Sequence, residues 1–168
     1  MLSVRELDSS RDSQVLADLV IALQNYERQF DPGMPEGSAM VQPYLALVLA
    51  RCGKWDGKMF VAEEGGKVVG FVCVWARVPS EEPDDDPSEY AFVSDLVVEP
   101  AHRRRGVGRQ LMSAAEAYAR ARGARRIRLT VLARNMAARG FYASMNYLER
   151  EIELEKSVDR GQPLTEGA

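Results

Sequence analysis

Four arginines and two glycines crowd a short stretch of the chain between residues 103 and 109. The stretch comprises Arg103, Arg104, Arg105, Gly106, Val107, Gly108 and Arg109. Apolar residues recur at helical spacing from Val107 onward, so we expect a helix to begin near Gly106. The first amide groups of a helix have no partner within it, and the helix dipole is positive at that end. Since glycines also let a ligand approach the backbone closely, the stretch predicts an anion site that suits a phosphate.

A predicted strand, Tyr90–Val98, leads directly into this turn. It ends in the apolar, strand-forming run Leu96, Val97 and Val98, and Pro100 cannot continue a hydrogen-bonded ladder. The predicted helix runs from about Gly106 to Arg122 and stops at Gly123, a residue typical of helix C-termini. Strand, turn and helix together would position the anion site.

Two common phosphate motifs do not fit this chain. A Walker loop needs the pattern GxxxxGK[ST], which occurs nowhere in the sequence. A dinucleotide-binding fold wants an acidic residue about 20 positions after its glycines to hold a ribose, and there is no acidic residue between Glu116 and Glu149. A third kind of phosphate site, one for coenzyme A, remains.

Three segments resemble the GNAT superfamily of acyl-CoA-dependent N-acetyltransferases. Arg103–Gly108 matches that family's signature [Q/R]-x-x-G-x-[G/A]. Asp95–Pro100 resembles its fourth strand, and Asn135–Tyr142 resembles its N-x-x-A-x-x-[FL]-Y helix. The predicted order of elements is similar over most of residues 2–156.

This resemblance implies acetyl-CoA as the co-substrate and gives each matching position a role. Main-chain groups of the strand would pair with the pantetheine arm, in a slot opened by a bulge that splays this strand from the next. Amides of residues 104–109 would wrap the pyrophosphate, and Asn135 would contact the pantetheine or the region near the thioester. The implied cofactor-binding residues are Leu96, Val97, Val98, Arg103, Arg104, Arg105, Gly106, Val107, Gly108, Arg109, Asn135, Ala138 and Phe141.

The resemblance also implies a direct attack of a neutral amine on the thioester. A strand amide would stabilise the oxyanion, and Tyr142 would protonate the departing thiolate. Some relatives, polyamine acetyltransferases among them, carry a glutamate base where this chain has Ser94. Ser94 could hold a relay water, whereas Asp95 would point to the opposite face of a regular strand. Glu27, Glu89 or solvent remain alternatives for the base.

Length and composition predict a single soluble domain. The 168 residues are 46% hydrophobic and 28% charged, and no apolar run approaches the roughly 18–20 residues that span a bilayer. The N-terminus lacks the pattern of a signal peptide. Two cysteines without CxxC spacing and one histidine favour a cytoplasmic protein with reduced thiols and no metal site. We expect a domain over 1–168, with a core at about 2–156 and a tail at 157–168.

Charge is spread unevenly along the chain. Residues 1–100 carry 8 basic and 18 acidic residues, whereas residues 101–148 carry 11 arginines and one acidic residue. This asymmetry could reflect two ligands of opposite sign or simply solvated faces. The acidic loop at 81–89 could attract a cationic acceptor such as a polyamine or an aminoglycoside, and a peptide amine stays open. The candidate substrate-binding residues are Tyr26, Glu27, Phe30 and Glu89.

The predicted elements alternate in a way typical of an α/β (α+β) domain. The expected strands are 2–7, 59–63, 68–76, 90–98, 126–132 and 147–155. The expected helices are 9–28, 40–52, 106–122 and a short one after Asn135. The unit from 90 to 132 should be a parallel crossover, and the strands before it an antiparallel meander. We therefore expect a mixed, mostly antiparallel sheet with helices on both faces and a splayed central parallel strand pair.

The leading hypothesis is an N-acetyltransferase that acts on a primary amine of a small, cationic molecule. The alternative is a CoA-binding regulatory or interaction module without turnover, motivated by the missing glutamate at Ser94. We expect no nucleic-acid or membrane partner, because the arginines sit in a chain that is acidic as a whole. Family resemblance leaves a homodimer open.

Overall fold

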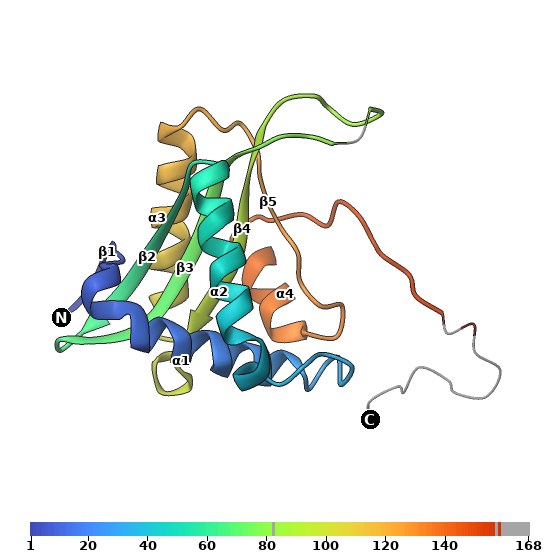
Figure 1. Cartoon of the computed structure of the whole chain (residues 1–168). Coiled ribbons are helices and arrows are strands. Elements are labelled where there is room, and N and C mark those ends of the chain that lie inside the picture. The colour runs from blue at the N-terminus through green and yellow to red at the C-terminus, as the bar shows by residue number, and fades with distance from the viewer. Residues whose placement is uncertain (82, 157, 159–168) are drawn as a thin grey trace.

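A five-stranded sheet forms the centre of the molecule (Figure 1), in a computed structural model that describes residues 1–81, 83–156 and 158. Its spatial order follows the sequence, from β1 to β5. The first four strands pair antiparallel, and β4 pairs with β5 in parallel. The strands are β1 (Leu2–Glu6), β2 (Gly57–Glu64), β3 (Lys67–Val78), β4 (Tyr90–Val98) and β5 (Ile127–Leu129).

Helices cover both faces of this sheet (Figure 1). The helices are α1 (Ser9–Glu27), α2 (Gly37–Lys54), α3 (Val107–Ala121) and α4 (Met136–Ala143). One core cluster packs α1 and α2 against the sheet through residues such as Leu19, Val48 and Phe71. The other packs α3 against the opposite face through Val72 and Leu111. The predicted mixed sheet with helices on both faces is therefore confirmed.

A β-bulge interrupts β4 at Ser94. The register pairs Val74 with Val93 and Cys73 with Asp95, so Ser94 is the extra residue on β4. A bulge shifts the side-chain alternation of its strand by one position. Accordingly, Val93 belongs to the core cluster on the α3 face, whereas Val97 belongs to the cluster on the α1 and α2 face.

β4 and β5 are paired over only part of their length. The ladder joins Ala91–Val93 to Ile127–Leu129 and ends there, although β4 continues to Val98. Within the described residues, no strand pairs with Ser94–Val98 on the β5 side. This is the splayed parallel pair that the sequence predicted, and it leaves main-chain groups of β4 open along one edge.

Two strand predictions near the C-terminus are wrong. β5 covers three residues instead of the predicted 126–132, and Tyr147–Glu155 forms no strand. Alternating side chains do not make a strand without a neighbouring ladder, and the short β5 offers little edge to pair with. Leu148 and Leu154 therefore stay 90% exposed. The predicted tail at 157–168 lies outside the described residues except for Val158, which is exposed.

No helix in the described part of the chain is long and apolar enough to cross a membrane.

Candidate functional site

The turn between β4 and α3 leads from the open edge of β4 to the N-terminus of a helix. Arg104 and Gly106 adopt positive φ angles of 63° and 83°, and α3 begins at Val107. A Cβ added at Gly106 would meet no atom within 4 Å, so the space beside it is open. The unpaired amides at the start of α3 therefore lie where the open strand edge ends.

The four arginines of the turn do not all face that space. Arg103 donates from Nε to the Val98 carbonyl at 3.0 Å, and its guanidinium lies over Tyr26. Arg105 forms an ion pair with Glu64, and Arg109 donates to Ser144 Oγ. In the described residues only Arg104 among the four has neither an ion pair nor a hydrogen bond from its guanidinium. The site thus offers backbone amides and one uncommitted arginine.

Gly108 and Val107 serve packing at this turn. A Cβ at Gly108 would approach the Phe141 ring to 3.3 Å, so the glycine lets α4 pack closely on α3. The Val107 side chain is buried in the core, which leaves only its main chain for a ligand. Asn135 is also buried, and its Oδ1 accepts a hydrogen bond from the Ala138 amide as the N-cap of α4.

The bulge in β4 brings two polar side chains to the same face. Ser94 Oγ donates to Asp95 Oδ2 at 2.7 Å, and Tyr44 donates from α2 to Asp95 Oδ1 at 2.6 Å. The expectation that Asp95 points away from Ser94 is therefore wrong, because the bulge breaks the regular alternation. Asp95 is buried and both of its carboxylate oxygens accept a hydrogen bond.

Burial of acidic groups shapes the electrostatics around this bulge. Burial raises the pKa of Asp95, against the lowering effect of its two hydrogen bonds. Burial and then the charge of Asp95 raise the pKa of Glu27, the last residue of α1. The pKa of Tyr142 on α4 rises to about 12, chiefly through burial and then through the charges of Glu27 and Asp95. These groups on two helices and β4 thus form one electrostatic cluster.

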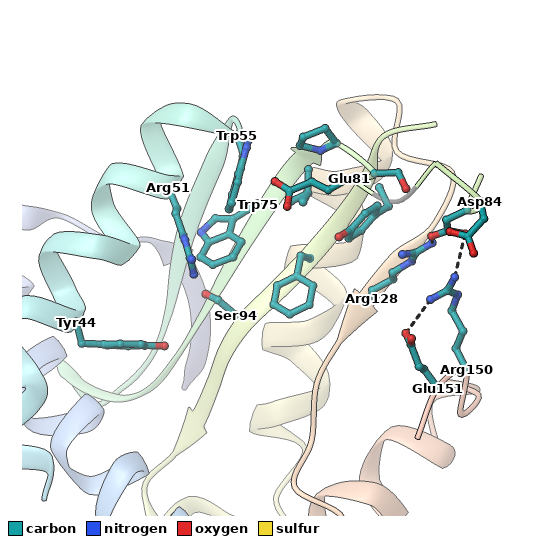
Figure 2. A pocket seen from close by; sticks show the side chains of 16 residues that line it. Tyr44, Arg51, Trp55, Trp75, Glu81, Asp84, Ser94, Arg128, Arg150 and Glu151 are labelled. Carbon is teal, nitrogen blue, oxygen red and sulfur yellow. Dashed lines mark hydrogen bonds and ion pairs between the residues drawn. The ribbon is translucent and has the colours of Figure 1, made fainter. Parts of the chain in front are cut away.

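A pocket of about 860 Å³ opens on the α2 side of the sheet, next to the bulge (Figure 2). Its aromatic wall includes Trp55, Trp75 and Phe92, with the Trp75 and Phe92 rings stacked 5.6 Å apart. Ser94 and Tyr44 line it from β4 and α2. Its remaining lining residues are Arg51, Val78, Pro79, Ser80, Glu81, Asp84, Asp85, Tyr90, Arg128, Arg150 and Glu151. A volume of this size suits a small organic molecule.

The structure gathers only some of the residues predicted to bind substrate. Tyr26 and Phe30 pack edge to face at the end of α1, and Arg103 covers Tyr26. Glu27 belongs to the electrostatic cluster around Asp95. Glu89 instead forms an exposed ion pair with Arg77 and does not line the pocket.

Arginines pair with the acidic loop that was expected to attract a cation. Asp85 binds Arg128 and Arg150 at 3.0 and 2.9 Å, and Asp86 binds Arg126. The basic and acidic parts of the chain therefore compensate each other here. This pairing gives the loop a structural role as one wall of the pocket.

The sequence interpretation missed the contribution of α2 to the pocket. Tyr44, Arg51 and Trp55 are spaced at i, i+7 and i+11, which places them on one face of a helix. That spacing was visible in the sequence and could have marked the face. Trp75 and Phe92 carried no such signal, because their pairing depends on the register of β3 and β4.

Known proteins resemble this chain in sequence and in structure. An uncharacterised N-acetyltransferase of Methanocaldococcus jannaschii is 36% identical over 100 residues, which cover 58% of this chain and 41% of that relative. The chain thus spans less than half of that relative's length. An uncharacterised N-acetyltransferase of Bacillus subtilis, YhfO, is 27% identical over 148 residues, covering 88% of this chain and 91% of the relative.

Two solved structures show the same fold at low identity. A GCN5-related N-acetyltransferase from Ralstonia eutropha has a TM-score of 0.72 at 23% identity, over 94% of this chain and 99% of that one. AAC(6')-Iy, solved with the bisubstrate analogue CoA-S-monomethyl-acetylneamine, has a TM-score of 0.63 at 20% identity, over 94% and 99% of the two chains.

The family match covers most of the elements described above. Residues 22–147 match the acetyltransferase (GNAT) family, from the end of α1 through the segment after α4. The match includes the bulged strand β4, the part of its edge that does not pair with β5, and the turn into α3. This chain belongs to the GNAT acetyltransferase family.

Proposed function

We propose that this protein transfers an acetyl group from acetyl-CoA to the amine of a small molecule. The observation that carries the proposal is the open edge of β4, which is unpaired beyond Val93 and ends at the N-terminus of α3. An extended, amide-rich ligand arm with an anionic group at one end fits such an edge. The GNAT family uses acetyl-CoA, and the CoA-linked analogue bound to AAC(6')-Iy supports the same co-substrate here.

The residues at this edge fit coenzyme A. Main-chain groups of Leu96–Val98 would hold the pantetheine arm, and amides of residues 104–109 would hold the pyrophosphate beside Arg104. The positive φ of Gly106 turns the chain so that these amides can converge, and the space beside it is open. Acetyl-CoA, when bound, supplies the thioester acyl group that the amine attacks.

Tyr142 acts as the acid in this proposal. Its phenol stays protonated at neutral pH, because burial and two nearby carboxylates raise its pKa to about 12. A thiolate leaving beside it would feel the same burial and the same charges, so its basicity would rise as well. The proton would then pass from Tyr142 Oη to the sulfur.

Ser94 and Asp95 provide a route for the proton of the amine. The Ser94 hydroxyl lines the pocket and donates its proton to Asp95 Oδ2. Ser94 Oγ could accept a proton from the attacking amine while its own proton moves to Asp95. Burial raises the pKa of Asp95, which makes this carboxylate a better proton acceptor than an exposed one.

The acceptor would enter the pocket with its amine toward Ser94. Ser94 bonds Asp95, which lies within electrostatic range of Glu27, so an ammonium group beside Ser94 would offset the charges of these two carboxylates. The proposal of a cationic acceptor therefore rests on these two carboxylates, since Asp85 and Asp86 are occupied by arginines.

A thiol-release assay with acetyl-CoA and a panel of amines tests the function. We expect turnover on at least one amine and a large loss of kcat in Tyr142→Phe. Tight CoA binding without turnover on any amine would favour a CoA-binding module instead. If CoA neither binds nor raises the melting temperature, both functions are excluded.

A further inference from the structure

Arg51 occupies an unusual position in the pocket next to the bulge. Its guanidinium lies 5.2 Å from the Trp75 ring centroid and 5.6 Å from the Trp55 centroid. Figure 2 shows its side chain running along the two indoles, with the charged end toward Ser94. Cation–π contacts of this kind hold an arginine in place without neutralising its charge.

The other two arginines of the pocket wall are neutralised. Arg128 and Arg150 both form ion pairs with Asp85, and Arg150 also binds Glu151. By contrast, no carboxylate among residues 1–81, 83–156 and 158 lies within 4 Å of the Arg51 guanidinium. A half-buried charge without a counterion is costly unless a ligand supplies one.

The geometry of Arg51 suits a planar, singly charged anion. A guanidinium presents its donors as a rigid fork that matches the two oxygens of a carboxylate. A phosphate dianion would call for a second cation, and the pocket's other arginines are already bound to Asp85. Because Arg51 and Ser94 line the same pocket, this anion would lie near the reacting amine.

We propose that Arg51 binds a carboxylate of the acceptor, so that the acceptor is an amino acid or a related amino carboxylate. This inference rests on the proposed acetyl transfer and specifies its substrate class. The amine faces Ser94, the carboxylate meets Arg51, and the body of the acceptor lies against Trp75 and Phe92. A pocket of about 860 Å³ accommodates an amino acid with a large side chain.

Matched pairs of compounds with and without a carboxylate test this proposal. The pairs are phenylalanine and phenethylamine, lysine and cadaverine, and arginine and agmatine. For each pair we compare kcat/KM in the wild type and in Arg51→Met, which keeps an apolar stem on the indoles. Taking the variant-to-wild-type ratio for each compound removes the difference in amine basicity between the two members of a pair.

We expect Arg51→Met to reduce the preference for the carboxylate member by about 10- to 100-fold, as for the loss of a charge-assisted hydrogen bond. Arg51→Lys should restore part of that preference. The matched control is Lys54→Met, since Lys54 lies over the Trp55 ring from the same helix but does not line the pocket. Lys54→Met should leave the preference at its wild-type value.

Two results would overturn the carboxylate site. In one, the wild type has a higher kcat/KM for the decarboxylated amines. In the other, Arg51→Met lowers kcat/KM by the same factor for both members of each pair. If the wild type acetylates no amine, the proposed function fails, and calorimetric binding of the same pairs to the CoA-loaded protein tests Arg51 alone. Carboxylate-dependent binding that Arg51→Met abolishes would support the site, and equal binding of both members would refute it.

An independent observation concerns the two cysteines. Cys52 on α2 and Cys73 on β3 are free thiols, and their sulfur atoms lie 3.6 Å apart. Cys73 is fully buried, whereas Cys52 is partly exposed. The thiol of Cys73 lowers the pKa of Cys52 more than burial raises it. Cys52 is therefore the accessible and more reactive member of the pair.

We infer that Cys52 and Cys73 are a modification site for a peroxide, which converts them to a disulfide. The Cys52 thiolate attacks one peroxide oxygen, breaks the O–O bond and becomes a sulfenic acid. Cys73 then attacks the Cys52 sulfur, hydroxide leaves, and two thiols and one hydrogen peroxide give a disulfide and two waters. The two sulfur atoms must close from 3.6 Å to about 2.05 Å to form the bond.

Peroxide treatment of the intact protein tests this second site. We expect the mass to fall by that of two hydrogen atoms, both thiols to become unreactive after denaturation, and dithiothreitol to reverse the change. The matched variants Cys52→Ser and Cys73→Ser should not lose the mass of two hydrogen atoms on the same treatment. Two thiols still titratable after peroxide, or oxidation of Cys52 without a cross-link to Cys73, would overturn the site.

Discussion

Two kinds of groups form the two proposed binding regions, the CoA site (the cofactor end) and the acceptor pocket next to the bulge (the acceptor end). At the cofactor end, the open edge of β4 and the first amides of α3 present main-chain groups, with Arg104 beside them. At the acceptor end, Tyr44 on α2 bonds Asp95 beside the bulge, and the charges of Asp95 and of Glu27 on α1 act on Tyr142 of α4. The comparison indicates that backbone conformation determines the first end and that side-chain chemistry determines the second. Variants at the cofactor end should therefore change CoA affinity, whereas variants at the acceptor end should change kcat or acceptor KM.

The largest effect is expected for Tyr142→Phe at the acceptor end. Loss of the phenolic proton should lower kcat by about 10²- to 10⁴-fold, the usual contribution of a positioned acid. Steady-state kinetics measures kcat, and calorimetry should show unchanged CoA affinity. Tyr147→Phe is the matched control, because Tyr147 packs 5.7 Å from Tyr142 but bonds Glu116 on α3. Equal losses in both variants would contradict the assignment.

Asp95→Asn should lower kcat by about 10²-fold or more, because Asn cannot accept the proton that Ser94 passes on. A base must be deprotonated, so wild-type activity should fall as the pH drops through the raised pKa of Asp95. This acidic limb should be absent in Asp95→Asn. Tyr44→Phe removes a hydrogen bond that lowers the pKa of Asp95, so the limb should move to higher pH.

The same pKa shift makes a testable statement about folding stability. A carboxyl whose pKa is raised on folding destabilises the native state while it is ionised, and this cost disappears as the pH falls through the raised pKa. The wild type should therefore gain stability relative to Asp95→Asn as the pH is lowered.

The assignment of Asp95 as the base is contradicted if the pH–rate profile of Asp95→Asn keeps the wild-type acidic limb. The base would then be another group, such as Glu27.

Gly106→Ala probes the cofactor end through backbone conformation alone. Its φ of 83° disfavours any residue with a Cβ, so the variant should lose about 1 kcal/mol of stability. Distortion of the first α3 amides should weaken CoA binding by about tenfold, a change of about 1.4 kcal/mol. Calorimetry measures the affinity, and kcat at saturating acetyl-CoA should change little.

Gly123→Ala is the control for this variant. Gly123 has a φ of 87° at the other end of α3, and a Cβ there also meets no atom within 4 Å. It should cost similar stability without weakening CoA binding. Equal CoA affinities in Gly106→Ala and Gly123→Ala would contradict the claim that the backbone conformation at Gly106 determines CoA binding.

Asp85→Asn should have the smallest effect. It removes two ion pairs at the rim of the pocket, and ion pairs that water can reach contribute little to stability. Acceptor KM should change by a few-fold and CoA affinity should not change. High salt should reduce the difference between this variant and the wild type.

The sequence predicted the end of β4, the turn and the start of α3 well because their signals are local. The apolar run before Pro100 marked the end of β4, and the glycines after Arg105 marked the start of α3. The short helix expected after Asn135 is α4, and the Asn135 side chain accepts from the Ala138 amide at its start. Each of these features depends on residues that lie close together in the chain.

The acceptor end was harder to predict because it depends on register and on distant contacts. The bulge at Ser94 is visible only in how β3 and β4 pair, and it moved Asp95 to the face of Ser94 and Tyr44. Asp85 of the acidic loop forms an ion pair with Arg128, which lies more than 35 residues away in the sequence. The strand predicted at 147–155 failed for the same reason, since no ladder receives it.

Amide hydrogen exchange with and without CoA tests the central claim most directly. We predict slower exchange at Leu96, at Val98 and at residues 104–109 when CoA is present, because these amides would bind the ligand. Val97 directs its amide to β3 instead, as Glu99 does to Val69, so its exchange should not change. Amides of β1, on the far edge of the sheet, should exchange at the same rate in both states. Unchanged exchange at Leu96, Val98 and residues 104–109 under saturating CoA would contradict the claim that the open edge of β4 and the turn into α3 bind the co-substrate.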